Sequence, residues 1–284
     1  MRKTGRKRKI NFTKMQSLGN DFIILDLLKN NIKISKKLIR DLSSRQYGVG
    51  CDQVLVISKS KDKKIHFNYK IFNSDGSEAS QCGNGAKCVG RFYFERYKPS
   101  VSKIYAKTSS SLIEIRRTIN NVYEINMGIP LLNKDEISSM CFYTGKNKIF
   151  SFNRRNYKFH ISYIGNPHAI FFMNSIDSFD LESFSIAFNK KKFFKHGVNI
   201  SVVKRISKSN ISLRVFERGV GETLSCGSAA CASVIALTNS YPTAANVSVN
   251  MLGGTARVKW NGKENSSLYL TGKASNIFDG EYYL

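Results

Sequence analysis

The sequence predicts a strand-rich α+β fold that contains a duplicated domain. Two observations support this prediction: short alternating apolar runs outnumber helical segments, and one block of sequence recurs about half a chain later. The length of 284 residues suits one large domain or two modest ones, at roughly 150 residues per domain. Hydrophobic residues make up 42% of the chain, which is enough for a buried core and argues against a disordered protein.

Short runs rich in β-branched and aromatic residues predict strands along the whole chain, and the first begins near Ile10. In several runs polar and apolar residues alternate, as in Phe67-Asn-Tyr-Lys-Ile-Phe72, which is typical of a half-buried strand. The strands expected after the first cover residues 52–57, 65–72, 112–116, 122–127, 161–164, 211–216 and 247–251.

A few segments between these strands predict helices. Ser35 is suited to cap a helix over residues 36–47, in which apolar residues recur on one face. Two further helices are expected to begin just after Cys82 and Cys226, because a glycine and a series of small residues follow each cysteine.

One block of sequence occurs twice. Residues 67–84 align with residues 211–228, so that the Cys-Gly pair at Cys82 falls opposite the pair at Cys226, 144 positions later. Both copies consist of an alternating strand, a turn that contains glycine, and a Cys-Gly pair that opens a helix. The two copies therefore predict the same local structure.

Two shorter matches extend the repeat upstream. Gly19-Asn20 resembles Gly165-Asn166, and Gln53 falls opposite Asn199, both at an offset of 146 positions. Three matches in the same order at nearly the same offset indicate a duplicated domain.

The duplication supplies two cysteines in equivalent places. Each stands at a strand–turn–helix junction, where backbone N–H groups and the helix dipole can bind a carboxylate and lower a thiol pKa. If two such units face one cleft, one thiolate can remove the proton beside a bound carboxylate while the opposite thiol protonates the other face. The pattern therefore predicts racemisation or epimerisation by Cys82 and Cys226 without a cofactor.

The net charge of +25, from 45 Lys and Arg against 20 Asp and Glu, admits two interpretations. A basic RNA-associated protein would carry its charge in a stripe interleaved with aromatic residues. Only residues 2–9 are dense in basic side chains, and Lys is otherwise scattered along the chain. We therefore favour Lys as a general solvated residue and expect no nucleic-acid partner.

No segment predicts export or a membrane span. Apolar stretches such as residues 22–28 are interrupted by charge and are too short for a bilayer. Residues 1–9 are basic but lack the apolar run of a secretory signal, so we expect them to form an N-terminal extension. The protein is then expected to be cytoplasmic, with its six cysteines reduced.

No metal site is expected at the cysteine pairs. Cys82 and Cys88 are six residues apart and Cys226 and Cys231 are five apart, spacings that do not place either pair on one helix face. Oxidation could join Cys82 to Cys226 in an inactivating disulfide. The remaining cysteines are interpreted as core residues: Cys51, Cys88, Cys141 and Cys231.

Five motifs, in a fixed order, cover the chain from about Ile10 to its end. They are Gly19-Asn-Asp-Phe22, Asp52-Gln53, the segment from Asn73 to Gly85, Gly165-Asn-Pro-His168, and the segment from Glu217 to Ser228. In these motifs the chain resembles the diaminopimelate epimerase family. The two cysteine segments together with Gly-Asn-Pro-His make the resemblance specific.

The resemblance implies two similar domains, each a β-barrel-like sheet wrapped around a central helix. An N-terminal epimerase domain would comprise residues 10–126 and 273–284, and a C-terminal epimerase domain residues 127–272. It also implies an isomerase that interconverts LL- and meso-diaminopimelate for lysine and peptidoglycan precursor biosynthesis. The enzyme would need no cofactor and no metal and would be a cytoplasmic homodimer.

The resemblance also assigns roles to individual residues. Cys82 and Cys226 match the two catalytic thiols, and His168 and Glu217 match the residues that assist them. The backbone N–H groups implied to hold the reacting carboxylate belong to Gly83, Asn84, Gly227 and Ser228. The other implied substrate-binding residues are Asn20, Gln53, Asn73, Asn166, Asn199, Glu217 and Arg218, whose guanidinium suits a distal carboxylate.

Ordinary structural roles are the alternative for several of these residues. Asn20 and Asn166 could be turn residues, His168 a core histidine, and Glu217 with Arg218 an exposed ion pair. The repeat makes the two asparagines equivalent in both halves, which favours a function for them.

Three residues depart from the family pattern. Lys87 stands where Arg is common, Ala229 where Gly is usual, and Phe278 where a Tyr linked to dimerisation is typical. Ala229 keeps its backbone N–H, so carboxylate binding should survive. The tyrosine hydroxyl missing at Phe278 removes a hydrogen bond of about 1 kcal/mol.

Two other enzyme types use the same scaffold. Proline-racemase-like enzymes also work with two thiols, but their substrate has no distal amino acid group for Asn73, Asn199 and Arg218 to bind. Phenazine-biosynthesis isomerases use the scaffold differently, and the presence of both Cys-Gly pairs argues against them.

Overall fold

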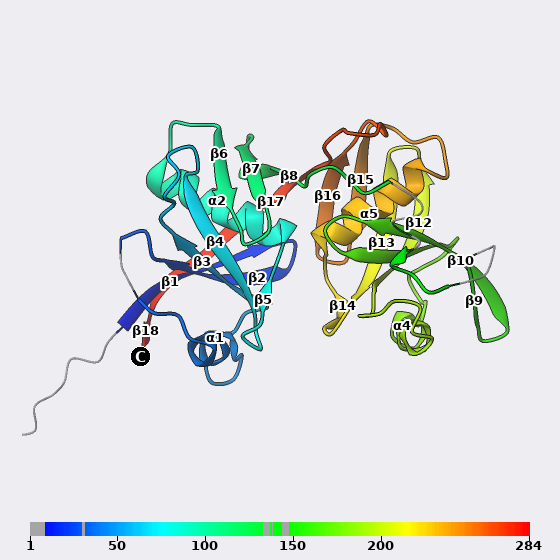
Figure 1. Ribbon diagram of the computed structural model, residues 1–284, viewed down its shortest axis with the longest axis horizontal. Coiled ribbons are helices and arrows are strands. Elements are labelled where there is room, and N and C mark those ends of the chain that lie inside the picture. The colour runs from blue at the N-terminus through cyan, green and yellow to red at the C-terminus, as the bar shows by residue number, and fades with distance from the viewer. Residues whose placement is uncertain (1–8, 30–31, 133–136, 138, 144–147) are drawn as a thin grey trace, which may run out of the picture. The chain divides into compact units, whose positions relative to one another are not determined.

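The computed structural model describes residues 9–29, 32–132, 137, 139–143 and 148–284. The chain forms two compact units: unit 1 comprises residues 1–17, 21–123 and 273–284, and unit 2 comprises residues 18–20 and 124–272. Residues 1–8 of the expected N-terminal extension lie outside the described residues, and Lys9 is already the first residue of strand β1. Figure 1 shows the elements of each unit.

Strands dominate both units, with only a few helices among them, which confirms the predicted α+β class. The elements of unit 1 are β1 (Lys9–Ser17), β2 (Asn20–Asp26), α1 (Lys36–Ser43), β3 (Gln53–Ser58), β4 (Phe67–Asn73), β5 (Glu78–Ala79), α2 (Gly83–Tyr97), β6 (Lys103–Lys107), β7 (Leu112–Arg117), β8 (Val122–Asn126) and β18 (Ser275–Tyr283). Those of unit 2 are β9 (Ile149–Phe152), β10 (Arg155–Tyr163), β11 (Pro167–Phe172), α4 (Leu181–Lys190), β12 (Asn199–Ser207), β13 (Asn210–Glu217), β14 (Gly221–Thr223), α5 (Gly227–Thr238), β15 (Asn246–Met251), β16 (Gly254–Lys259) and β17 (Tyr269–Lys273). The boundary between the units runs through β8 and the end of β17.

The two units share one pattern of strand pairing. In unit 1, β2 pairs with β3 in parallel, β3 with β4 and β4 with β5 antiparallel, and β4 with β6 in parallel. In unit 2, β11, β12, β13, β14 and β15 repeat these pairings in the same order and directions. The register agrees as well, since Phe22 pairs with Gln53 and, 146 positions later, His168 pairs with Asn199. The sequence repeat is therefore also a structural repeat.

A helix begins at each predicted cysteine and is buried within its unit. Helix α5 contacts β10, β11, β12 and β16, and all of its residues except Ser228 and Thr238 are buried. Helix α2 is buried from Gly83 to Gly90 and contacts β1, β3, β7 and β18. The buried part of each helix belongs to the core of its unit, and Figure 1 shows strands of the same unit beside each helix.

The first helix is shorter than predicted. The Ser35 side chain accepts a hydrogen bond from the Leu38 N–H (3.1 Å), so the predicted cap is confirmed. Helix α1 nevertheless ends at Ser43 rather than at Tyr47, because Ser44 adopts an extended conformation. The chain then turns toward β3 through Gly50, whose φ of +79° favours glycine.

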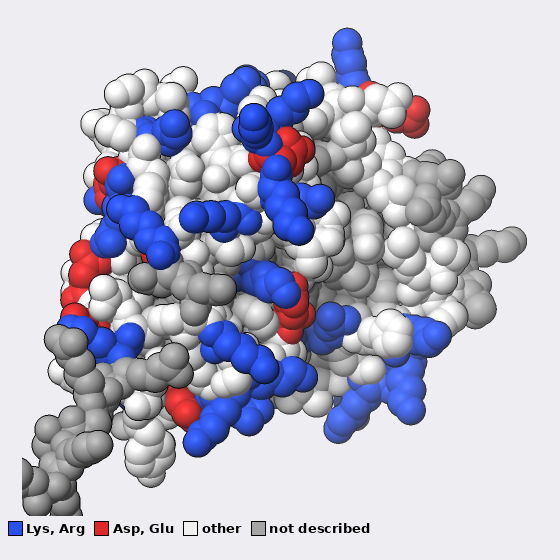
Figure 2. Space-filling view, turned by 60° about the vertical axis from the view of Figure 1, so that its left-hand side comes forward, with Lys and Arg blue, Asp and Glu red and all other residues white. Residues whose placement is uncertain are grey.

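The surface charge is dispersed on the face that Figure 2 displays. Lys and Arg side chains are spread over much of this face, with Asp and Glu among them, rather than gathered in one stripe. This distribution fits the interpretation of Lys as a general solvated residue. Among the described residues, no helix combines the length and apolarity that a bilayer span requires.

Candidate functional site

The first predicted thiol is the N-cap residue of α2. Cys82 has an extended backbone (φ −152°, ψ 107°), and its Sγ accepts a hydrogen bond from the Gly85 N–H at 3.3 Å. The first backbone bond of the helix runs from the Ala86 N–H to the Cys82 carbonyl (2.9 Å). The N–H groups of Gly83 and Asn84 therefore precede the helical ladder, at the positive end of the helix dipole.

Two of the predicted amides in unit 1 form a chain of hydrogen bonds. Gln53 Nε2 donates to Asn73 Oδ1 (2.9 Å), and Asn73 Nδ2 donates to Ser77 Oγ (3.0 Å). The Ser77 hydroxyl in turn donates to Asp75 Oδ1 (2.6 Å). This chain fixes the orientation of both amides. We call these amides and the predicted residues at the start of α2 the N-terminal half-site: Gln53, Asn73, Cys82, Gly83 and Asn84.

The residue before β2 has a strict conformational requirement. Gly19 adopts φ +81°, and a Cβ at this position would lie 2.8 Å from Leu224 Cδ1. The backbone angle favours glycine, and a Cβ would also displace the Leu224 side chain. Asn20, which the sequence predicts to bind substrate, follows Gly19 and is the first residue of β2.

The second predicted thiol is the N-cap residue of α5. Cys226 is buried, and its Sγ lies 3.4 Å from Ser228 Oγ. Burial, and next the Glu217 carboxylate, raise the pKa of the Cys226 thiol well above its usual value. The Cys226 side chain makes no capping hydrogen bond, although the backbone of Ala229 still lowers the thiol pKa. The lowered thiol pKa expected from the helix terminus is thus wrong for Cys226, because burial and a neighbouring anion outweigh the dipole.

The other predicted residues of unit 2 are held by direct hydrogen bonds. Asn199 Oδ1 accepts from the Arg218 backbone N–H (2.9 Å), and Arg218 Nη1 donates to the His196 carbonyl (2.9 Å). The imidazole Nε2 of His168 lies 3.0 Å from Asn166 Oδ1. We call the predicted site residues of this unit the C-terminal half-site: Asn166, His168, Asn199, Glu217, Arg218, Cys226, Gly227 and Ser228.

His168 is fully buried, and burial lowers its pKa to about 3. The imidazole is therefore neutral near pH 7. Its Nδ1 is buried and has no hydrogen-bond partner among the described residues. A neutral imidazole with one uncommitted ring nitrogen can accept a proton or bind a donor group of a ligand.

Sequence reasoning missed two side chains next to the thiols. Thr223 Oγ1 donates to Glu217 Oε1 (2.7 Å) and so fixes the carboxylate beside Cys226. Tyr69 is buried, and burial together with Cys82 raises the pKa of its phenol. The alternation of residues 67–72 did place Tyr69 on the buried face of its strand. Nothing in the sequence distinguishes the Thr223 hydroxyl from that of an ordinary surface threonine in a strand.

The residues that depart from the family pattern differ in their surroundings. Lys87 and Ala229 are fully buried in α2 and α5, whereas Phe278 is 47% exposed and forms an edge contact with Phe12.

No disulfide joins any of the six cysteines, all of which are described. The cysteines interpreted as core residues are buried, as predicted: Cys51, Cys88, Cys141 and Cys231.

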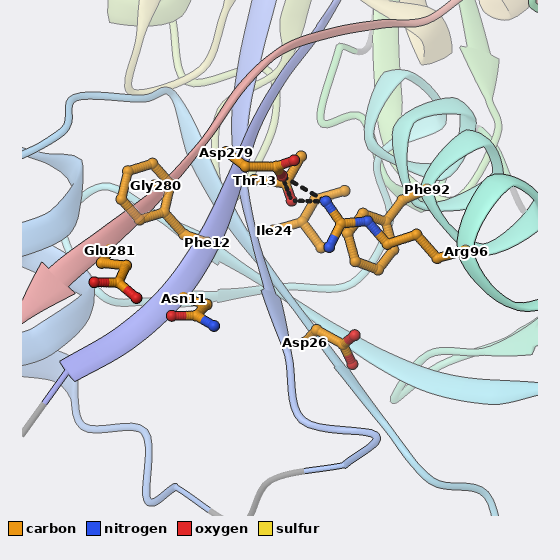
Figure 3. A pocket seen from close by; sticks show the side chains of 10 residues that line it. All are labelled: Asn11, Phe12, Thr13, Ile24, Asp26, Phe92, Arg96, Asp279, Gly280 and Glu281. Atoms are coloured by element: carbon orange, nitrogen blue, oxygen red, sulfur yellow. Dashed lines mark hydrogen bonds and ion pairs between the residues drawn. The ribbon is translucent and has the colours of Figure 1, made fainter.

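A cavity of about 320 Å³ in unit 1 lies between β1, β2, β18 and α2, and none of the predicted site residues lines it. Figure 3 shows Arg96 pointing across it toward Thr13 and Asp279, to both of which it is hydrogen-bonded (3.1 and 2.5 Å). The charged groups at its centre are thus already paired with each other. The cavity offers no chemistry comparable to that of the half-sites.

Comparison with known proteins agrees with this arrangement. The model of the diaminopimelate epimerase family matches residues 12–132 and 160–277. A diaminopimelate epimerase from Buchnera aphidicola subsp. Baizongia pistaciae (strain Bp) is 35% identical over 97% of this chain and 96% of its own length.

Solved structures share the fold at low identity. A hydroxyproline epimerase from Agrobacterium vitis has a TM-score of 0.72 at 12% identity, covering 98% of this chain and 94% of that one. A phenazine biosynthesis protein from Bacillus anthracis has a TM-score of 0.68 at 15% identity, covering 98% and 100%. These likenesses show the fold alone.

The family match and the curated relative both cover nearly the whole chain, and they confirm the predicted resemblance and the predicted enzyme class, an isomerase. On this evidence, the chain belongs to the diaminopimelate epimerase family.

Proposed function

We propose that this protein interconverts LL- and meso-diaminopimelate with Cys82 and Cys226 as its two acid–base groups. The observation that carries the proposal is the equivalence of the two cysteines: each is the N-cap residue of a buried helix at the same place in the repeat. One thiolate accepts the α-proton, and the other thiol delivers a proton to the opposite face of the same carbon. Both thiols exchange with solvent afterwards, so the proton balance closes without a cofactor.

The surroundings of the thiols support an assignment of resting states. The raised pKa of Cys226 keeps this side chain protonated, which suits it to act first as the acid. Cys82 then acts as the base in that direction, and the roles exchange in the reverse reaction. His168 and Glu217 assist proton movement at Cys226.

The helix termini supply the stabilisation that the reaction needs. The N–H groups of Gly83, Asn84, Gly227 and Ser228 precede the first helical hydrogen bonds, where they are suited to bind the reacting carboxylate and the charge that develops on it. Arg218 has guanidinium N–H groups beyond the one bonded to His196, which suit it to the distal carboxylate. The remaining polar contacts to the substrate come from Asn20, Gln53, Asn73, Asn166 and Asn199.

The proposal is tested with purified, reduced protein in EDTA without added cofactor. LL-diaminopimelate, L-proline and trans-4-hydroxy-L-proline are supplied separately, and stereoisomers are resolved by chiral chromatography. We expect turnover of diaminopimelate alone. If the protein converts either proline substrate but does not convert diaminopimelate, the substrate assignment is wrong. A requirement for an added cofactor would overturn the mechanism.

We also propose that the enzyme is a cytoplasmic homodimer. Several apolar side chains at the C-terminal end are exposed, among them Ile277 (54%), Phe278 (47%) and Tyr283 (62%). A second copy of the chain would cover this surface on β18. Light scattering after gel filtration is expected to give twice the mass of 32.1 kDa, and Ile277→Glu is expected to give monomers.

A further inference from the structure

A pair of acidic residues joins the beginnings of two strands in unit 1. Asp21 follows Asn20, and Asp52 precedes Gln53. The Asp52 N–H donates to Asp21 Oδ1 (2.8 Å), and the Asp21 N–H donates to Asp52 Oδ2 (3.0 Å). This reciprocal pair ties the first residues of the parallel strands β2 and β3 to each other.

Two cations hold the two carboxylates together. The Arg45 guanidinium binds Asp21 through both terminal nitrogens (3.0 and 2.8 Å) and Asp52 Oδ1 through one of them (2.8 Å). Lys14 Nζ donates to Asp21 Oδ2 (2.6 Å) and to the carbonyl of Gly50. The Lys14 and Asp21 side chains are only 11% and 18% exposed, so salt screens this pair less than a surface pair. We call the four charged residues the β2–β3 clamp: Lys14, Asp21, Arg45 and Asp52.

Unit 2 has no counterpart of the clamp among its described residues. Pro167 and Val198 stand at the positions equivalent to Asp21 and Asp52. Neither side chain carries a charge, and Pro167 has no backbone N–H. The amides of the C-terminal half-site are instead bonded directly to their neighbours.

Gln53 follows Asp52 of the clamp, and only one of the two polar atoms of its side chain is hydrogen-bonded to a described residue. Gln53 Nε2 donates to Asn73, but Gln53 Oε1 is buried and accepts no hydrogen bond from the described residues. Burying an acceptor without a donor costs free energy. An ammonium or N–H group of a ligand would recover this cost.

We propose that the β2–β3 clamp is a positioning network that holds Asn20 and Gln53 in the orientation that binds the substrate, with Gln53 Oε1 accepting from its ammonium group. The inference rests on the proposed function. The clamp fixes the backbone from which both amides project, and it contains neither thiol. Its loss therefore weakens substrate binding without changing proton transfer.

The Asp52→Ala variant tests this role. We expect KM for diaminopimelate to rise about tenfold, with kcat within about twofold of the original. Glu95→Ala is the matched control, because Glu95 is 41% exposed against 43% for Asp52 and pairs with Arg91 at 2.8 Å. This control should leave both constants unchanged. Where Asp52→Ala does not fold, Asp52→Asn is expected to raise KM to a smaller extent.

A second readout does not require turnover. In substrate-free, ¹⁵N-labelled protein, the side-chain amide signals of Asn20 and Gln53 should shift or broaden in Asp52→Ala but not in Glu95→Ala. An inactive original enzyme would overturn the proposed function while leaving this test of positioning intact. Unchanged amide signals in folded Asp52→Ala, an unchanged KM, or a fall in kcat as large as the rise in KM would each overturn the inference.

Discussion

The N-terminal and C-terminal half-sites share one scaffold but differ in the groups around the thiol. Asn73 in the first corresponds to Glu217 in the second, 144 positions later, and both end the strand that leads into the turn before the helix. Position 73 therefore carries a neutral amide, which is hydrogen-bonded to Gln53, whereas position 217 carries a carboxylate that raises the thiol pKa of Cys226. The repeat thus keeps a cysteine at the N-cap of a buried helix in both units, but the equivalent strand ends carry different side chains.

The largest effect is expected from removing either thiol. Cys82→Ala and Cys226→Ala should each lower kcat about 10³-fold or more, since one face of the substrate loses its acid or base. Chiral analysis of the products measures this loss. Cys231→Ala, a buried cysteine outside the half-sites, serves as the control. Full turnover in either single variant would contradict the two-thiol proposal.

Neutralising the carboxylate should make the two half-sites more alike. Glu217→Gln removes one of the groups that raise the pKa of Cys226, so this pKa falls and the thiolate fraction at a given pH rises. We expect faster alkylation of Cys226 by iodoacetamide, followed by peptide mass spectrometry, and a fall in kcat of about 10²-fold. Glu182→Gln, on the exposed side of α4 in the same unit, should change neither. An alkylation rate of Cys226 that does not increase in Glu217→Gln would show that the carboxylate does not raise the thiol pKa.

His168 makes the stability of unit 2 dependent on pH. Its pKa is about 3 when folded and about 6.5 when unfolded, so the unfolded chain binds the extra proton as pH falls below 6.5. Stability then decreases toward acid, by about 2 kcal/mol between pH 7 and pH 5 for this group. Urea unfolding at the two pH values should show a smaller decrease in His168→Gln. An equal decrease in both proteins would indicate that His168 is not held neutral by burial.

The smallest effect is expected at Thr223. Thr223→Val removes the hydrogen bond to Glu217 while keeping the shape of the side chain, at a cost of about 1 kcal/mol. This corresponds to a fall in kcat of about fivefold. Thr223→Ser should restore most of the activity, which a purely steric role of the threonine would not explain.

Much of the fold could be predicted from the sequence, because the repeated segments contain local signals for the strands and for the two buried helices. The alternation in β4 predicted a strand, the Cys-Gly pairs predicted the starts of two helices, and the nearly equal offsets predicted the duplicated domain, which the matching strand registers then reveal in the structure. The end of α1 was predicted too late. No strong breaker follows Ser43 directly, and only the tertiary position of β3 determines where the chain must turn.

The side-chain chemistry around the thiols could be predicted only in part. The raised pKa of Cys226 depends on burial and on a carboxylate that reaches it in space. The argument from the helix terminus alone predicted a lowered thiol pKa. The β2–β3 clamp also escaped prediction, since Lys14, Asp21, Arg45 and Asp52 are dispersed in the sequence and are joined only by the pairing of β2 with β3.

The central claim is that two thiols act on opposite faces of one α-carbon. Its most direct test is conversion of LL-diaminopimelate in deuterated water, stopped below about one tenth of completion, with deuterium measured separately in substrate and product. A two-thiol mechanism predicts one solvent deuterium at the inverted carbon of the meso product and none in the recovered substrate. Meso product that retains the original proton would show that a single group removes and returns it, and would contradict the account.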